Sequence, residues 1–194
     1  MTSLRESKKA ATRSALARVA AELVLRDGAE GLTIPAITAA AGVSPRTFHN
    51  YFASREEAVI DFITGRVSEL VVDFESLPAE LDLLTAVERI VSQNLRTGDL
   101  ELDSFPTLFK LCEVVESLAP QHSACVTRPI LDPMIVSLRE RTEGLSDFQL
   151  STLVRIIAAA MGSALEWHYR SPEPRDPVEG EKLLREAVEL IRPV

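Results

Sequence analysis

Residues 32–52 read LTIPAITAAAGVSPRTFHNYF, a stretch with two helix starts on either side of a glycine. Thr33 and Ser44 are residue types that cap a helix N-terminus. Each is followed within two positions by a proline, which a first helical turn tolerates. Gly42, between the two starts, can adopt the left-handed conformation that a tight helix exit requires. The stretch therefore predicts two short helices joined by a glycine turn, which is the layout of a helix-turn-helix.

The second of these helices has one apolar face and one polar face. Phe48 and Phe52 are four positions apart, so both side chains can point into a core. Arg46, Thr47 and Asn50 then point away from that core. A helix of this kind fits the major groove of DNA, which is about 12 Å wide.

The polar side chains of this stretch have the chemistry that nucleic acids require. Arg46 is the best candidate for reading guanine, because its planar fork can contact O6 and N7 together. Asn50 can pair with adenine or bind a phosphate, and hydroxyl and ring groups can bond base edges or phosphates. We expect these residues to contact DNA: Thr33, Ser44, Arg46, Thr47, His49, Asn50, Tyr51 and Arg55.

The charge of the chain is distributed unevenly. The net charge is −8, which by itself argues against a polyanionic partner. Residues 1–55, however, carry eight basic and four acidic side chains, whereas residues 56–194 carry 13 basic and 25 acidic ones. A basic end can meet a polyanion while an acidic body limits non-specific adhesion. We expect Lys8, Lys9 and Arg13 to add phosphate contacts from the first helix.

Helical patterns fill most of the remaining chain, and strand alternation is scarce. Residues 5–27 carry apolar side chains at helical spacing and are followed by glycines at 28 and 31. Ser54 to Glu57 form a capping box that starts a long helix ending near residue 76. Further helices are predicted at about 80–97, 104–117, 122–142, 146–170 and 177–191. We predict an all-α protein with two domains, residues 1–55 and residues 56–194.

Residues 32–57, LTIPAITAAAGVSPRTFHNYFASREE, resemble the DNA-binding signature of TetR-family transcriptional regulators. The matching elements are Leu32-Thr33, Ala40 to Ser44, Thr47-Phe48, Tyr51-Phe52 and Ser54 to Glu57. The resemblance implies that residues 1–55 are a three-helix DNA-binding domain containing the helix-turn-helix. It implies that residues 56–194 are a larger helical effector-binding and dimerisation domain, and that the protein is a homodimer.

The resemblance also assigns site residues. The positions that contact DNA in the family are occupied here by Thr33, Ser44, Arg46, Thr47, His49, Tyr51 and Arg55. Arg55 stands where the family commonly has lysine, and we expect a phosphate contact to survive that change. Pro35 stands where a polar residue is more usual, and we expect it to remove at most one peripheral contact.

Residues 153–165, LVRIIAAAMGSAL, are apolar on nearly every side and are interrupted by Arg155 and Ser163. A helix without a polar face must be covered on both sides, so one side needs a partner. The last helix adds an apolar stripe: Leu183, Leu184, Ala187, Val188 and Ile191. We expect these two helices to form a four-helix dimer interface. The alternative is that both stripes only complete the core of one chain.

Aromatic residues and methionines in the second domain suit an adaptable apolar pocket for a small-molecule effector. We expect its walls to include Phe62, Phe74, Phe105, Phe109, Met134, Met161 and Trp167. His168 and Glu166 can supply polar anchors. The alternative is that these side chains are simple core.

These features together predict a ligand-responsive transcriptional regulator, acting as a repressor. It would bind a near-palindromic operator in double-stranded DNA as a homodimer and be released by a small-molecule effector that the sequence does not identify. One alternative is a helical protein-interaction module that does not bind DNA. A helical enzyme lacks support, since the chain has no HExxH, P-loop or GxSxG pattern.

The cysteine count and the lack of long apolar runs exclude further classes of protein. The chain has two cysteines, Cys112 and Cys125, too few for a disulfide scaffold or a cysteine-built zinc site, and we expect neither a metal nor a cofactor. We expect buried thiol packing rather than oxidant sensing at both cysteines. The start of the chain lacks the shape of a signal peptide, and no uncharged apolar run is long enough to span a membrane. We therefore expect a cytoplasmic protein without a membrane partner.

Overall fold

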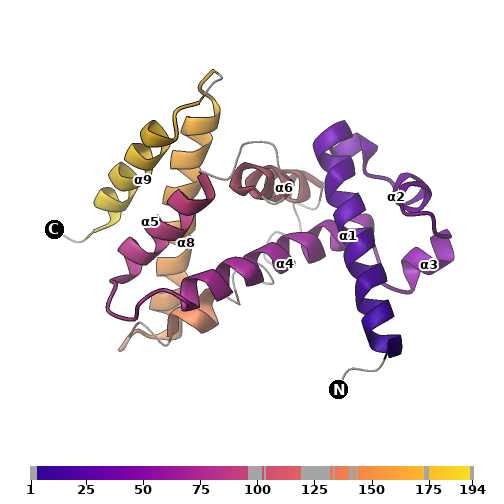
Figure 1. Cartoon of the computed structure of the whole chain (residues 1–194), viewed down its shortest axis with the longest axis horizontal. Coiled ribbons are helices and arrows are strands. Elements are labelled where there is room, and N and C mark those ends of the chain that lie inside the picture. Colours follow the sequence, from indigo (N-terminus) through magenta and orange to yellow (C-terminus); the bar gives the residue numbers. More distant parts are fainter. Residues whose placement is uncertain are drawn as a thin grey trace. The chain divides into compact units, whose positions relative to one another are not determined.

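The computed structural model describes residues 4–95, 102, 104–118, 132, 134–139, 142, 144–172 and 175–192. Within these residues the regular secondary structure is helical and no strand occurs, which confirms the predicted all-α class. The helices (Figure 1) are α1 (Leu4–Gly31), α2 (Ile34–Ala40), α3 (Pro45–His49), α4 (Arg55–Glu75), α5 (Leu83–Leu95), α6 (Phe105–Leu118), α8 (Asp147–Tyr169) and α9 (Pro177–Ile191).

The chain divides into two compact units. The first unit contains α1, α2, α3, α4 as far as Arg66, and α6 from Lys110. The second unit contains α4 from Val67, α5, α6 as far as Phe109, α8 and α9. Two of the helices, α4 and α6, therefore contribute residues to both units.

The core of the first unit is built on one stripe of α1. Leu16, Ala20 and Val24 recur every four residues, and all three are fully buried. This spacing gives α1 a continuous apolar face. Ile37 of α2 and Phe48 of α3 are also fully buried. The helix α2 packs against both α1 and α3, so the helix-turn-helix is part of this core.

The first helix does not end where its glycines suggested. Gly28 has φ 69° and ψ −163°, and the helix kinks there and resumes as far as Gly31. Glycine adopts positive φ without the steric penalty that a Cβ would bring, which explains why the kink falls at this residue. The prediction that the first helix stops at Asp27 was therefore wrong by one kinked turn.

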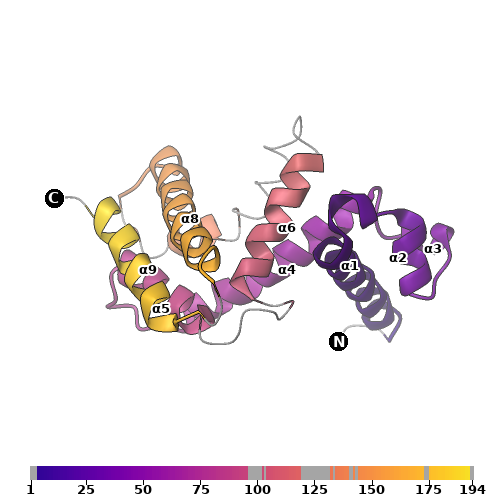
Figure 2. The ribbon, with the colours of Figure 1, turned by 90° about the horizontal axis from the view of Figure 1, so that it is seen from above.

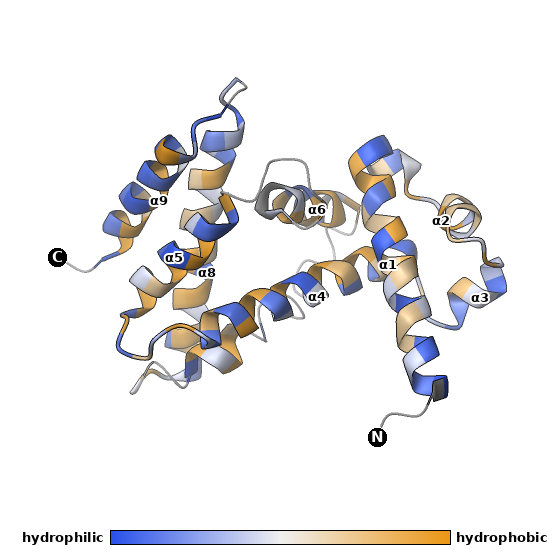
Figure 3. Ribbon diagram, in the orientation of Figure 1, coloured by the Kyte–Doolittle hydropathy of each residue, from blue (hydrophilic) through white to orange (hydrophobic). Residues whose placement is uncertain are grey.

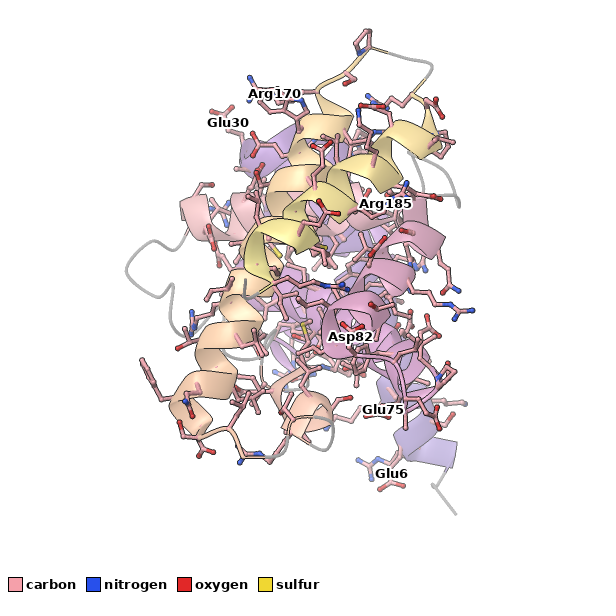
Figure 4. All side chains as sticks on the ribbon, turned by 90° about the vertical axis from the view of Figure 1, so that its left-hand side faces the viewer. Glu6, Glu30, Glu75, Asp82, Arg170 and Arg185 are labelled. Atoms are coloured by element: carbon pink, nitrogen blue, oxygen red, sulfur yellow. The ribbon has the colours of Figure 1, made fainter. Side chains whose placement is uncertain are left out.

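In the second unit α9 lies against both α8 and α5 (Figures 1 and 2). Ile157, Met161 and Leu165 of α8 form a buried cluster with Leu184 and Val188 of α9. Hydrophobic and hydrophilic bands alternate along α9 (Figure 3), as expected for a helix that buries one face. Charged side chains such as Arg185 and Arg170, labelled in Figure 4, remain exposed to water.

Small residues permit close helix packing in this unit. A Cβ built on Gly180 of α9 would lie 3.1 Å from the ring of His168 on α8 and 3.1 Å from Leu95 of α5. His168 itself is buried. A Cβ on Gly162 of α8 would lie 2.8 Å from the ring of Phe109. The glycines therefore leave room for these rings.

Of the described helices, α8 is the one whose length and hydropathy would suffice to cross a membrane, with a mean hydropathy of 1.4 over 18 residues. Core helices of globular domains pass the same test. This helix begins at a capping box, in which Ser146 and Gln149 bond each other's backbone N–H groups. Its buried side chains pack against α9 and α5, as in a core helix.

Helix α5 begins three residues later than predicted, because Asp82 caps it. The backbone N–H of Thr85 donates to Oδ1 of Asp82 at 3.1 Å, and the hydroxyl of Thr85 donates to Oδ2. These hydrogen bonds hold the pKa of Asp82, labelled in Figure 4, below its usual value. The helix predicted at 122–142 falls mainly outside the described residues. Within that range, the described residues 132 and 134–139 are helical.

Candidate nucleic-acid interface

The first helix of the helix-turn-helix starts as its sequence predicts. Oγ1 of Thr33 accepts a hydrogen bond from the backbone N–H of Ala36 at 3.2 Å, which confirms Thr33 as the N-cap of α2. After α2, the N–H of Val43 donates to the carbonyl of Thr38 at 3.0 Å. Gly42, inside this turn, has φ 65°, a conformation that residues with a Cβ rarely adopt. The turn therefore needs its glycine.

Helix α3 starts in the same way. Oγ of Ser44 accepts from the backbone N–H of Thr47 at 3.1 Å, which confirms Ser44 as the N-cap. The two hydroxyl groups also bond each other at 2.9 Å. Pro45 occupies the first helical position, where a backbone N–H would have no intrahelical partner. The local sequence therefore sets where this short helix begins.

The faces of α3 divide as predicted, with one exception. Phe48 is 0% exposed, Phe52 is 1% exposed, and their ring centroids are 5.7 Å apart. Arg46, Asn50 and His49 are exposed to water. The exception is Thr47, which was expected to point outward and is half-buried. The buried phenylalanines thus fix one side of the segment and leave its basic and amide side chains open.

The charge around α3 is compatible with an anionic partner. No acidic residue occurs between Glu30 and Glu56, so the whole helix-turn-helix is free of carboxylate side chains. On α1, Lys8 and Lys9 are exposed. Nothing in the immediate sequence would therefore repel a phosphate backbone from Arg46.

Arg13 does not have the free guanidinium that the charge pattern suggested. Its Nη1 donates to the carbonyl of Tyr51 at 2.8 Å, and its Nε and Nη2 donate to Oδ1 of Asp61 at 2.9 and 2.7 Å. The expected phosphate contact is therefore in competition with an internal role. Tyr51, a predicted phosphate contact, is half-buried, and its backbone is tied to α1.

Arg55 is also engaged within the protein. Its Nη1 donates to the carbonyl of Leu32, and its Nε donates to Oε1 of Glu56 at 2.8 Å. Burial tends to raise the pKa of Glu56, but hydrogen bonds from Arg55, the backbone and Ser54 outweigh it and leave that pKa lowered. The ionised form of Glu56 is therefore favoured, and this carboxylate pairs with Arg55. The predicted phosphate contact of Arg55 would require its guanidinium to serve a third partner besides Leu32 and Glu56.

The capping box predicted at Ser54 forms in a modified way. Oγ of Ser54 accepts from the N–H of Glu57 at 3.1 Å, as expected. The carboxylate of Glu57 accepts instead from the N–H of Ala53 at 2.6 Å. Hydrogen bonds with Glu57 therefore fix both Ala53 and Ser54 in the loop between α3 and α4.

Asp61, the partner of Arg13, is a residue that the local sequence did not single out. It lies on α4, 48 residues from its partner Arg13. A single acid on a mixed helix gives no local signal, because only the packing of α1 beside α4 brings the two groups together.

The predicted effector-pocket residues lie in several places. Phe74 and Met134 belong to one apolar cluster, and Phe109 and Met161 belong to another. Phe62 is half-buried on α4, and the side chain of Phe105 lies outside the described residues.

The remaining pocket candidates lie at the end of α8. Trp167 is 67% exposed, so the single chain does not enclose it. Of the two expected polar anchors, His168 is buried beside Gly180, and Glu166 is exposed and pairs with Arg170 at 3.4 Å. Within the described residues, no three His, Cys, Asp or Glu side chains group as a metal site would require.

Comparisons with known proteins agree with this arrangement. Residues 16–60 match the family model of bacterial regulatory proteins, tetR family. Over 101 residues the chain is 37% identical to the HTH-type transcriptional regulator TcmR of Streptomyces glaucescens. That match covers 50% of this chain and 45% of TcmR, so more than half of the relative's length lies outside it.

Two solved structures share the fold over nearly the whole chain. One, described as a TetR-family transcriptional regulator from Mesorhizobium loti MAFF303099, has a TM-score of 0.62 at 17% identity and covers 93% of this chain and 95% of its own. The multidrug binding protein EbrR complexed with proflavin has a TM-score of 0.55 at 18% identity and covers 91% and 99%. At such identities the likeness concerns the fold. Residues 16–60 thus resemble the tetR family of bacterial regulatory proteins, and most of the chain shares the fold of the two solved structures.

Proposed function

We propose that this protein is a transcriptional regulator that binds double-stranded DNA through the exposed face of α3. The observation that carries the proposal is the orientation of that helix. Phe48 and Phe52 are buried and anchor one side, while Arg46, His49 and Asn50 are exposed on the other. A short helix held in this way presents polar groups to a major groove, which is the geometry of helix-turn-helix readers.

Within this proposal Arg46 reads a guanine, and Asn50 pairs with adenine or a phosphate. Ser44, Thr47 and His49 contact base edges or phosphates near the groove. Thr33 lies at the start of α2 and contributes a phosphate contact. The hydroxyl groups of Ser44 and Thr47 already bond each other, so each contributes to DNA only its remaining hydrogen-bonding capacity.

The protein acts as a homodimer in this proposal, with the exposed face of α8 forming the shared interface. The apolar stripe of α9, which was expected to join that interface, is instead packed against α8 and α5 of the same chain. Phe148, Ile156 and Trp167 are 78%, 44% and 67% exposed, and helical periodicity puts them on one side of α8. Large exposed apolar side chains on one helix face are typical of a surface that a partner covers. Two copies of α3 related by a two-fold axis would then read a near-palindromic site, with half-sites about 34–36 Å apart or a multiple of that spacing.

A small-molecule effector that binds two conformations unequally would change the separation of the two α3 helices and hence the affinity for DNA. The complex of EbrR with proflavin supports a small organic molecule as the class of effector. We infer a repressor that such a molecule releases, working in the cytoplasm where its DNA lies. Phe109 and Met161, which belong to one cluster, are the best-supported wall residues.

The test is selection of bound sequences from a random library of duplex DNA by the full-length protein. We expect an enriched near-palindrome whose two halves are separated by about one helical turn, or a multiple of it. Binding of the selected duplex should weaken steeply with rising salt. Recovery of no enriched duplex would contradict the proposal and favour a protein-interaction module.

A further inference from the structure

A single guanidinium in the first unit joins three segments that are distant in sequence. Arg13 lies on α1 and donates to the carbonyl of Tyr51, directly after α3, and to the carboxylate of Asp61 on α4. A second carboxylate, that of Glu57, lies 4.0 Å from Nη2. Three donor atoms of one side chain are therefore used within the protein.

The same guanidinium also lies against the aromatic anchor of this segment. Cζ of Arg13 is 4.4 Å from the centroid of the Phe52 ring, within the range of a cation–π contact. Phe52 in turn contacts Phe48, whose ring is fully buried beneath α3. Arg13 thus combines hydrogen bonds and a ring contact at the place where the chain leaves α3 and turns toward α4.

Helix α3 needs such a support because it is short. It spans five residues, Pro45–His49, and a helix of that length has little stability of its own. Its start is held by the Ser44 cap, within the same segment. Its exit is tied to α1 and α4 by Arg13. A planar side chain with five fixed donors can serve a carbonyl and a carboxylate together, which a lysine ammonium cannot do in the same geometry.

We propose that Arg13 is a positioning residue for DNA recognition, acting through Tyr51 and Asp61 rather than by contact with DNA. This inference rests on the proposed function of the preceding section. The bonds from Arg13 hold the exit of α3 in the orientation in which Arg46 and Asn50 can read base edges. Binding that depends on phosphate charge alone does not need that orientation.

Substitution of Asp61 distinguishes a positioning role of Arg13 from a simple effect of charge on DNA binding. Replacing an acid by a neutral side chain lowers the negative charge of the DNA-binding unit, and charge alone would then strengthen binding to any duplex. The positioning role gives the opposite sign for the specific site, because Asp61→Asn weakens the partner that orients the guanidinium.

The experiment measures the affinity of full-length variants at several salt concentrations. The probes are the duplex enriched by selection and a scrambled duplex of the same length and composition. Arg13→Lys keeps the charge, and we expect it to bind the selected duplex about tenfold more weakly, as for a lost charged hydrogen bond. Its affinity for the scrambled duplex and its salt slope should stay unchanged. Asp61→Asn should weaken binding of the selected duplex in the same way.

Lys9→Gln is the matched control, since Lys9 is an exposed cation on the same helix. If Lys9 contacts a phosphate, this variant should weaken binding to both duplexes alike and lower the salt slope by about one. The inference would be overturned if Arg13→Gln weakened binding to both duplexes alike and lowered the salt slope, while Arg13→Lys bound both as the wild type does. That result would show that Arg13 is itself a phosphate contact.

Tighter or unchanged binding of the selected duplex by Asp61→Asn would also overturn it. Circular dichroism and thermal unfolding show whether each variant is folded. If Arg13→Lys is unfolded, Asp61→Asn gives the decisive measurement. Loss of fold in both would make the pair an element of stability rather than of recognition and would overturn the inference. A wild-type protein that binds no duplex would instead refute the proposed function on which the inference rests.

Discussion

The guanidinium of Arg55 donates a hydrogen bond to the backbone carbonyl of Leu32, 23 residues earlier in the chain. Leu32 directly precedes Thr33, the N-cap of α2, so this bond ties the start of α4 to the start of α2. The same side chain bonds Glu56. A residue predicted to meet phosphate therefore links two helices of the first unit.

Arg55→Gln should lower the free energy of unfolding by about 1–3 kcal/mol, because it removes the charged donor that satisfies a part-buried carbonyl. Urea unfolding followed by circular dichroism measures the change. Arg46→Gln is the control: Arg46 is exposed, and we expect its loss to change stability by no more than about 0.5 kcal/mol. An Arg55→Gln variant as stable as the wild type, with a salt slope lowered by about one, would indicate a phosphate contact instead.

Arg46→Ala should weaken binding to the selected duplex by about 1–3 kcal/mol and relax discrimination at one base position, because a bidentate contact to a base is lost. Repeating the selection with the variant shows which position is relaxed. Lys9→Gln, by contrast, should affect all sequences alike. Unchanged base preference in Arg46→Ala would contradict the assigned role.

Two glycines give opposite expectations for the same substitution. Gly65 lies within α4 with no heavy atom near the position of a Cβ, so Gly65→Ala should stabilise the protein by about 0.5–1 kcal/mol through helix propensity. Gly180→Ala should lose that gain, because its Cβ would press on His168 and Leu95 at 3.1 Å. Thermal unfolding of the two variants compares them. An equal rise in Tm for both would show that α9 moves away from α8 freely.

The thiol of Cys112 should be unreactive in the folded protein. Burial, with further contributions from Glu116 and Glu113, raises its pKa to about 12. Almost no thiolate then exists near neutral pH, and reactivity should appear only at strongly alkaline pH or on unfolding. Labelling with iodoacetamide in a Cys125→Ser background measures it. Rapid labelling at pH 8 without loss of structure would revive a role in oxidant sensing.

Trp167→Glu should convert the proposed dimer to monomers, because a charge would enter an apolar interface. Size-exclusion chromatography with light scattering measures the mass. Val72→Glu is the control, since Val72 is 64% exposed on α4 and lies outside the proposed interface. A dimer that survives Trp167→Glu would place the interface elsewhere. Loss of the dimer in both variants would point to a general effect on folding.

Local patterns were sufficient to predict much of the helix-turn-helix in the first unit. The caps at Thr33 and Ser44, the glycine turn and the buried pair Phe48 and Phe52 follow from spacings of one to four residues, which act within one or two helical turns. The structure confirms these features, and the two caps and the phenylalanine pair each join residues that are at most four positions apart. The kink at Gly28 was missed, since a glycine can end a helix or bend it with similar ease.

Long side chains were less predictable. Sequence could show that Arg13 and Arg55 are cationic and near a DNA-binding motif, and the resemblance to a family suggested a phosphate for Arg55. Their actual partners, Asp61 and the carbonyl of Leu32, lie 48 and 23 residues away. Which group such a flexible cation meets depends on how the helices pack.

The starts of α2 and α3 and the exposure of Arg46, His49 and Asn50 are thus properties of short-range spacing and capping, whereas the partial burial of Thr47 was not predicted. The use of each arginine, the burial of His168 beneath Gly180 and the exposure of Trp167 arose only once the helices were packed. The physical reason is range: capping and periodicity act over a few residues, whereas ion pairs and close contacts join atoms that the chain brings together from far apart.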